Sequence, residues 1–387
     1  MRVQRGPAAA GMAGFLLGAG GMFAVTYSTQ AILPELGRAF GVSPAQAGLT
    51  LSVVVLALAC GAWIWGPLSD RIGRRRSIVL ASTLLVLPTV GAALAPTFAA
   101  LLVFRALQGL CIPGLLTSGV PYITEVFAPR IGGRAMGYYV TALVAGGLIG
   151  RVGVALLTAA FGWRWAIGLL AILPLAAAFV MRRTLVDVSL PPAGSGRDAV
   201  TRQLRNGTLL RATAAGSAFF FTFLATFSYV IYRLERPPFD FSPAVGSLVF
   251  LLWFFGVLGP WFGRLADRVG WRRLALGALG LAAVGLALTL PARLPTLVVG
   301  LTCITLANWG GVTAAQLGVA DSTAVDRGAA SAVYFSIYYL VGAVGAWLPG
   351  LAWDRYRWDG VAVTGFVALA LATVVLVTGE GRSAPIP

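Results

Sequence analysis

The chain has 387 residues, of which 58% are hydrophobic and only 11% are charged. Soluble domains carry about 25% charged residues, so this composition excludes an ordinary soluble protein and indicates an integral membrane protein. The net charge is +16, and all 29 basic residues are arginines. Because these arginines fall mainly in short loops between apolar runs, we expect the lipid bilayer as their partner and no nucleic acid.

Twelve apolar runs are long enough to cross a membrane, since a helix needs ~20 residues to span the hydrocarbon core. Arginine-rich connections alternate with arginine-poor ones, so the positive-inside rule predicts a multi-pass protein with both termini in the cytoplasm. We interpret the first run as a retained span and not as a cleaved signal peptide. The predicted spans cover residues 13–34, 47–66, 77–95, 99–122, 135–160, 164–181, 209–232, 243–262, 273–291, 295–318, 328–351 and 359–378.

The longest connection joins the sixth and seventh spans and contains prolines, glycines and serine among charged residues. This composition predicts a flexible cytoplasmic linker over residues 182–208. The linker would separate an N-terminal six-helix bundle, residues 1–181, from a C-terminal six-helix bundle, residues 209–387. The sequence therefore predicts an all-α membrane protein with twelve transmembrane helices in two pseudo-symmetric bundles.

One loop motif occurs twice. Gly66–Arg76 reads GPLSDRIGRRR, and Gly263–Arg273 reads GRLADRVGWRR, with seven of eleven positions identical at an offset of 197 residues. The residues before the second span of each half also match: Ser43 and Ser242 are each followed by a proline, and each is expected to cap a helix N-terminus. A repeat of half the chain length in a hydrophobic protein indicates a duplicated transporter fold.

These residues resemble the major facilitator superfamily over essentially the whole chain. The loop motif resembles that family's loop between helices 2 and 3, and Arg105, Gln108 and Gly109 resemble a motif of its drug/proton antiporter branch. Ala145–Gly153, AGGLIGRVG, occupies the place of the antiporter motif in helix 5, and the twelve-span exporters of the YnfM type are most similar. The resemblance implies secondary transport by alternating access, with export of a small organic solute and proton coupling.

The loop motif also predicts a conformational latch on the cytoplasmic side. Asp70 can accept hydrogen bonds from a helix N-terminus, which the family's geometry places near Gly328, and Arg71, Arg74 or Arg75 can pair with Glu125. The alternative is that the arginines only set membrane topology. The predicted latch residues are Gly66, Asp70, Arg71, Gly73, Arg74, Arg75 and Glu125 in the first half, and Gly263, Asp267, Arg268 and Asp321 in the second.

Two arginines lie inside predicted spans, both in the outer half of the membrane. A charge at the centre of a membrane helix costs at least ~2.5 kcal/mol, so it normally faces a cavity or a partner. Arg105 could contact substrate or could bond backbone carbonyls of the first helix near Pro34. Arg151, which stands where the family's motif has proline, could contact an anionic substrate or could pair with Glu35.

Polar and aromatic residues near mid-span mark the expected substrate site. Each has a structural alternative, either in an interfacial aromatic belt or in a hydrogen bond between helices. The candidate substrate-binding residues are Tyr27, Gln30, Arg105, Gln108, Arg151, Tyr229, Asn308, Tyr334 and Tyr338.

Three functions remain open. The first is a proton-coupled exporter in the cell inner membrane, which the resemblance implies. The second is an organic-anion carrier or exchanger that uses Arg151 and Arg105 without proton coupling, since all 13 carboxylates lie in loops or at span ends and histidine is absent. The third is a transporter-like sensor or lipid-handling protein. No nucleophile–base pair, metal cluster or nucleotide-binding loop is apparent, so we expect no enzyme, metal or cofactor, and a monomer that binds a small molecule.

Overall fold

The computed structural model describes residues 5–127, 134–187, 197–323 and 326–378, and every regular element in these ranges is a helix. The helices before the linker are α1 (Arg5–Tyr27), η1 (Gln30–Ile32), α2 (Leu33–Phe40), α3 (Pro44–Ile72), α4 (Arg74–Leu94), α5 (Phe98–Cys111), α6 (Pro113–Tyr122), η2 (Ile123–Phe127), α8 (Arg134–Leu148), η3 (Ile149–Gly153), α9 (Val154–Phe161), α10 (Trp163–Leu169) and α11 (Ile172–Thr184). Those that follow are α12 (Arg197–Gln203), α13 (Gly207–Leu234), α14 (Pro243–Gly246), η4 (Ser247–Leu258), α15 (Gly259–Val269), α16 (Trp271–Thr289), α17 (Leu294–Asp321) and α18 (Arg327–Val377).

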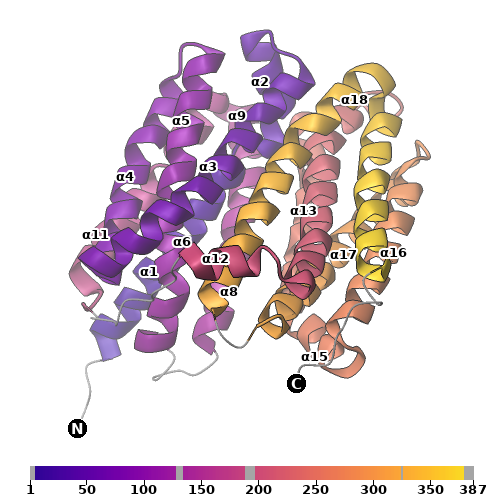
Figure 1. The fold of residues 1–387 in the computed structure, drawn as a ribbon. Coiled ribbons are helices and arrows are strands. Elements are labelled where there is room, and N and C mark those ends of the chain that lie inside the picture. The colour runs from indigo at the N-terminus through magenta and orange to yellow at the C-terminus, as the bar shows by residue number, and fades with distance from the viewer. Residues whose placement is uncertain (1–4, 128–133, 188–196, 324–325, 379–387) are drawn as a thin grey trace. The chain divides into compact units, whose positions relative to one another are not determined.

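Eleven helices in the described residues are long and apolar enough to cross a membrane. The count is one below the twelve predicted spans because α18 contains two of them. Its helical path is interrupted at Arg357, where φ is 54° and ψ is −135°, and Figure 1 shows the chain turning back there into a second arm. The predicted spans 328–351 and 359–378 correspond to these two arms, so the twelve-helix fold class is confirmed.

The duplicated sequence features adopt duplicated local structures. Ser43 Oγ accepts the Gln46 N–H at 3.2 Å, and Ser242 Oγ accepts the Val245 N–H at 3.4 Å, so both expected N-caps are present. Gly73 and Gly270 separate successive spans at φ values of 89° and 84°. This left-handed region favours glycine, which explains why the repeated loop motif contains glycine at that position in both copies.

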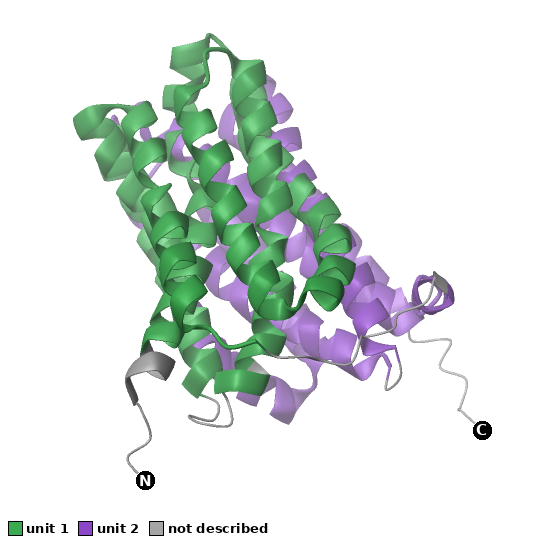
Figure 2. Ribbon diagram, turned by 90° about the vertical axis from the view of Figure 1, so that its left-hand side faces the viewer, with its two compact units in different colours: residues 1–192, 241–254 green, residues 193–240, 255–387 purple. Residues whose placement is uncertain are grey.

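Two compact units make up the chain (Figure 2). Unit 1 contains residues 1–192 and 241–254, and unit 2 contains residues 193–240 and 255–387. Most of residues 241–254 form the first part of the predicted eighth span, 243–262, and the segment groups with unit 1 because its side chains pack on that unit, as described below. The predicted bundle limits, 1–181 and 209–387, remain a prediction. The Pro/Gly-rich part of the predicted linker falls within 188–196, outside the described residues.

Candidate functional site

The first membrane span of unit 1 is broken near its C-terminal end. Helix α1 ends at Tyr27, the short 3₁₀ turn η1 covers Gln30–Ile32, and α2 begins at Leu33. Ser28, Thr29 and Gln30 are fully buried at this break. A helix end leaves backbone carbonyls without intrahelical partners, and inside a membrane these groups need partners from the protein.

Arg105 of α5 supplies those partners. Its guanidinium donates from Nη1 to Val25 O at 2.8 Å, from Nη2 to Thr26 O at 2.7 Å and from Nε to Thr50 O at 2.9 Å. Nη1 also donates to Gln108 Oε1 at 2.8 Å. All three guanidinium nitrogens are therefore hydrogen-bonded, and the side chain is fully buried.

The geometry thus favours the structural alternative for Arg105, although the carbonyls lie at Val25 and Thr26 and not near Pro34. Gln108 belongs to the same network, because it accepts from Arg105 and its Nε2 donates to Thr89 Oγ1 at 3.2 Å. Both side chains hold the broken first span in place. Arg105 Nη1 also reaches Ser28 Oγ at 3.2 Å and Nη2 reaches Thr29 Oγ1 at 3.4 Å, so Arg105 has no donor left to direct at a substrate.

Arg151 lies on η3, a π-helical turn of the fifth span. Single π-turns inside α-helices occur frequently at functional sites. Arg151 Nε donates to Gln30 Oε1 at 2.7 Å, and Nη1 donates to Gly147 O at 3.1 Å. Nη2 has no hydrogen-bond partner among the described residues, and the side chain is fully buried. The break in the first span therefore meets a buried guanidinium that is only partly hydrogen-bonded.

Aromatic rings surround the Arg151 guanidinium. Its central carbon lies 3.8 Å from the Tyr27 ring centroid, 4.5 Å from Trp253 and 5.5 Å from Phe250. Trp253 and Phe250 come from residues 241–254, and these contacts account for the packing of that segment on unit 1. A cation over aromatic faces gains ~2 kcal/mol or more when it is desolvated, which offsets part of the cost of burying the charge.

No carboxylate pairs with Arg151 in the part of the chain that the structure describes. Glu35, the partner considered from sequence, instead forms an exposed ion pair with Arg38 at 2.9 Å. The proposed Arg151–Glu35 pair is therefore wrong: Glu35 lies on α2, with Arg38 one turn away, and its side chain is partly exposed. Among the described residues, polar dipoles and aromatic faces are what balance the positive charge of Arg151.

The candidates in unit 2 divide into two kinds. The Tyr229 hydroxyl donates to Ala346 O at 2.9 Å, and Tyr338 stacks on Phe220 at 4.3 Å, so both have structural contacts. Asn308 Oδ1 and the Tyr334 hydroxyl are buried without a hydrogen-bond partner among the described residues. Asn308 and Tyr334 therefore remain the candidates of unit 2 with unused polar atoms.

Two members of the predicted latch form an ion pair within the described residues of unit 1. Arg74 Nε lies 3.7 Å from Glu125 Oε2, one of the pairings expected from sequence. The contact expected between Asp70 and the helix near Gly328 would join two units that are described separately, and it stays a prediction. A Cβ on Gly66 would meet no atom of its own unit within 4 Å, and the same holds for Gly263. Close helix packing within the unit is therefore not the role of either glycine.

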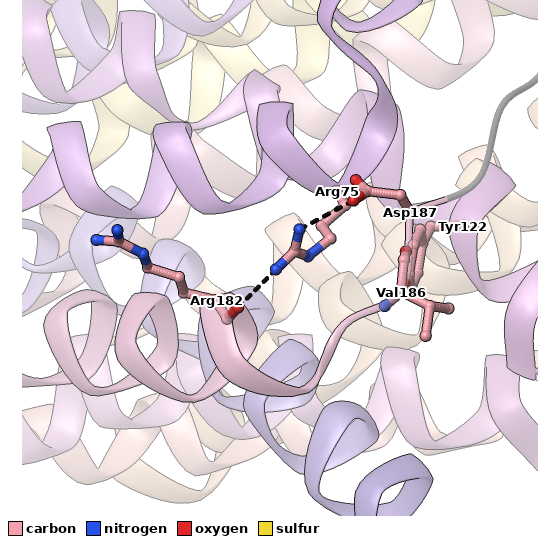
Figure 3. A network of polar contacts seen from close by, with 5 residues as sticks. All are labelled: Arg75, Tyr122, Arg182, Val186 and Asp187. Carbon is pink, nitrogen blue, oxygen red and sulfur yellow. Dashed lines mark hydrogen bonds and ion pairs between the residues drawn. The ribbon is translucent and has the colours of Figure 1, made fainter.

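Arg75 has different partners from those expected. It donates from Nη1 to Asp187 Oδ2 at 3.0 Å and from Nη2 to Arg182 O at 2.6 Å. Figure 3 shows these contacts beside Tyr122, whose hydroxyl accepts the Val186 N–H at 3.0 Å. Arg75 thus caps the C-terminal end of α11 and holds the first residues after it.

The corresponding arginine of the second copy acts similarly. Arg272, 197 residues after Arg75, donates from Nη2 to Leu376 O at 2.5 Å, at the C-terminal end of α18. The remaining charged latch candidates are exposed at helix ends, and their role stays a prediction: these are Asp70, Arg71, Asp267, Arg268 and Asp321.

Sequence reasoning missed several contacts. Trp253 and Phe250 lie in an unbroken apolar run, and no spacing rule relates them to Arg151. Arg233 was assigned no role, yet it is buried and donates to Thr289 O and Leu290 O at the end of α16. Its place in the last turn of an apolar helix was the available signal, since arginines there commonly reach backbone carbonyls.

The comparisons with known proteins agree with this architecture. A sequence model of the Major Facilitator Superfamily matches residues 15–346. The Bacillus subtilis protein YybF, an uncharacterized transporter of that type, is 28% identical over 94% of this chain and 92% of its own length. The Escherichia coli inner membrane transport protein YnfM is 30% identical over 92% of this chain and 86% of its own length.

Among solved structures, a bacterial homologue of the lysosomal transporter Spinster superimposes with a TM-score of 0.80. It covers 97% of this chain and 98% of its own, and at 17% identity it shows a shared fold. The family match spans most of the chain, and the relatives are transporters and not enzymes. The chain belongs to the Major Facilitator Superfamily and is a multi-pass membrane transporter of a small molecule.

Proposed function

We propose that this transporter exports a small organic anion across the cytoplasmic membrane, by alternating access, with Arg151 as its charged contact. The observation that carries the substrate class is the charge of Arg151, which is buried without a carboxylate partner among the described residues. A buried cation of this kind attracts a carboxylate or similar group, and repels the lipophilic cations that acidic sites bind.

Three further features support a site at Arg151. The first span is discontinuous at Gln30, and discontinuous membrane helices commonly form the substrate site of transporters. Arg151 stands on a π-turn. Its Nη2 has an unused donor, and the surrounding rings of Tyr27 and Trp253 can pack against the organic part of a substrate.

The described state is closed over Arg151, so a substrate can reach it only if the covering rings move. Trp253 and Phe250 lie on η4, which is a 3₁₀ helix of 12 residues. Long 3₁₀ stretches are uncommon because their hydrogen-bond geometry is poor, and they often mark hinges. We therefore assign the opening of the site to a change in η4.

The second candidate function is proton-coupled export of a drug-like solute. It is favoured by Arg105, Gln108 and Gly109, which resemble the motif of the antiporter branch. Against it, the carboxylates of the described residues lie at or beyond span ends. In either case we propose a monomer with both termini in the cytoplasm. We also propose that it lies in the inner membrane, because the relative YnfM is an inner membrane transport protein.

A ligand screen on purified protein separates the two candidates. Panels of organic anions, lipophilic cations and neutral sugars are tested by thermal shift, because a ligand that binds the folded state raises the apparent melting temperature. We expect stabilisation by anions, and loss of that stabilisation in Arg151→Gln. The matched control is Arg38→Gln, which removes an exposed arginine of the same unit and should leave anion binding unchanged.

Flux in proteoliposomes then tests the coupling. We expect Arg151→Gln to lower uptake of the identified anion at least tenfold, which corresponds to ~1.4 kcal/mol of lost binding free energy. We also expect a protonophore to leave anion uptake by the wild-type protein unaffected. Normal uptake by Arg151→Gln would remove the anion site. Stabilisation by cations that is indifferent to Arg151, together with flux that follows a pH gradient, would establish the second candidate instead.

A further inference from the structure

A groove lies at the cytoplasmic end of the predicted eighth span, on helix α15 of unit 2 (labelled in Figure 1). It has a volume of about 300 Å³ and is lined by Trp261, Arg264, Leu265 and Arg268. A volume of this size is sufficient for a small polar group. The groove lies far in sequence from Arg151 and from the candidates of α17 and α18.

The groove occupies one face of α15. Successive helical residues are about 100° apart, so residues 261, 264, 265 and 268 share a face. Phe262 and Ala266 point the other way, and both are buried. Phe262 packs beside Gly310 of α17, where an added Cβ would lie 3.0 Å from its ring. The groove is therefore on the outer surface of the helix, away from the helices of unit 2 behind it.

Two arginines give the groove a concentrated positive charge. Arg264 and Arg268 are one turn apart, and like charges at this spacing repel each other. Neither forms an ion pair or hydrogen bond with any residue that the structure describes, including Asp267, their neighbour in sequence. Binding an anion between them would remove the repulsion and provide charge-assisted hydrogen bonds.

Exposed apolar side chains lead up to the arginines. Val257, Leu258 and Trp261 expose 41%, 36% and 52% of their surface. Tryptophan is enriched where the hydrocarbon core of a membrane meets its headgroups, and the cytoplasmic leaflet carries anionic lipids. An apolar surface that ends in a tryptophan and two arginines matches the acyl chain, the interface and the phosphate of such a lipid.

The first copy of the loop motif lacks this combination. At the offset of 197 residues, Ile64 corresponds to Trp261, Pro67 to Arg264 and Arg71 to Arg268. The loop motif therefore does not require Arg264 or Trp261. Their presence in the second copy alone indicates a function that the duplicated motif does not explain.

We propose that this groove binds the headgroup of an anionic phospholipid of the cytoplasmic leaflet, with its phosphate between Arg264 and Arg268 and its glycerol region against Trp261. The site is independent of the transported substrate. It would anchor the cytoplasmic end of α15 to the membrane surface.

Native mass spectrometry of the full-length transporter tests the site. Phosphatidylglycerol and phosphatidylcholine are titrated separately into wild type, Arg264→Gln and the control Arg205→Gln, which removes an exposed arginine from the linker region. One arginine near an anionic surface contributes ~1 kcal/mol, so Arg264→Gln should weaken phosphatidylglycerol binding about fivefold. Arg205→Gln should bind it as wild type does.

Three results would overturn the proposal. The first is that Arg264→Gln binds phosphatidylglycerol as tightly as wild type does. The second is that Arg205→Gln loses as much phosphatidylglycerol affinity as Arg264→Gln does. The third is that wild type binds phosphatidylcholine as tightly as phosphatidylglycerol. Inorganic phosphate is included as a competitor, and displacement of the lipid by millimolar phosphate would show a free-anion site instead. Melting temperatures in phosphatidylcholine confirm that each variant is folded, so a lost lipid adduct is attributable to the groove.

Discussion

At the residue scale, two buried arginines of unit 1 have opposite characters. Arg105 donates from all three guanidinium nitrogens to oxygens of the first, second and fourth spans, whereas Arg151 donates to one amide and one carbonyl and otherwise contacts rings. Their sequence signals are the same, an arginine inside an apolar run. Only the hydrogen-bond partners distinguish a structural residue from a candidate binding residue.

This difference predicts different effects on stability. Arg105→Ala leaves the carbonyls of Val25 and Thr26 buried without donors, and each unsatisfied group costs about 1–3 kcal/mol. We expect a clear fall in the melting temperature of Arg105→Ala in detergent. Arg105→Lys should restore part of that melting temperature, because an ammonium group still donates hydrogen bonds but lacks the planar, forked donor arrangement of the guanidinium. Arg151→Gln keeps a polar side chain beside Gln30 and should melt close to wild type. Equal melting of Arg105→Ala and wild type would contradict the structural role.

At the element scale, each copy of the repeated loop motif contacts the C-terminal end of the last membrane helix in its half of the chain. Arg75 holds the end of α11 and Asp187, and Arg272 holds the end of α18. Beyond the undescribed residues 188–196, the linker helix α12 belongs to unit 2, where Arg202 donates to Asp326 at 2.7 Å. The Asp326 carboxylate raises the pKa of Arg202 further above its ordinary value, so the Arg202 guanidinium stays charged at every physiological pH.

Limited digestion with trypsin tests the role of Arg75. Removing its two hydrogen bonds in Arg75→Ala frees the end of α11, so cleavage after Arg182 or Arg183 should become several times faster. The control is Arg272→Ala, which frees the end of α18 in the other unit and should leave that cleavage rate unchanged. Fragments are mapped by mass spectrometry. An unchanged rate in Arg75→Ala would mean that the contact does not hold the helix end.

At the scale of the whole molecule, alternating access requires the cytoplasmic side to close and open. The Arg74–Glu125 pair lies within unit 1, and the expected contact of Asp70 would reach beyond it. We expect Asp70→Asn to populate the cytoplasm-open state more, because an amide accepts hydrogen bonds from a helix N-terminus less strongly than a carboxylate. Spin labels at the exposed residues Arg76 and Val269 should then show a longer mean distance.

Glu35→Gln is the control for that measurement, because it removes a carboxylate from α2 instead of the loop motif. It should leave the label distances as in wild type. An unchanged distribution in Asp70→Asn would remove Asp70 from the latch, and the loop arginines would then be explained by membrane topology alone.

Local sequence patterns determined much of this protein. Apolar run lengths are sufficient to locate the membrane spans, because in lipid every backbone group must be paired within a helix. The N-caps at Ser43 and Ser242 and the turns at Gly73 and Gly270 follow from short-range chemistry. The sequence also separates the eleventh span from the twelfth, although both lie in the single helix α18, whose helical geometry is interrupted at Arg357 and resumes immediately after it.

The tertiary structure decided the partners of charged residues. Sequence placed Arg105 and Arg151 at similar depth, but it could not show that a break in the first span brings carbonyls to one and Gln30 to the other. It placed Glu35 within reach of Arg151, whereas α2 turns it toward Arg38. These outcomes depend on contacts between residues far apart in the chain, and the lengths of helices and the charges of loops do not encode such contacts. Sequence periodicity specifies a helix and its faces, but it does not specify which atoms another helix presents to those faces.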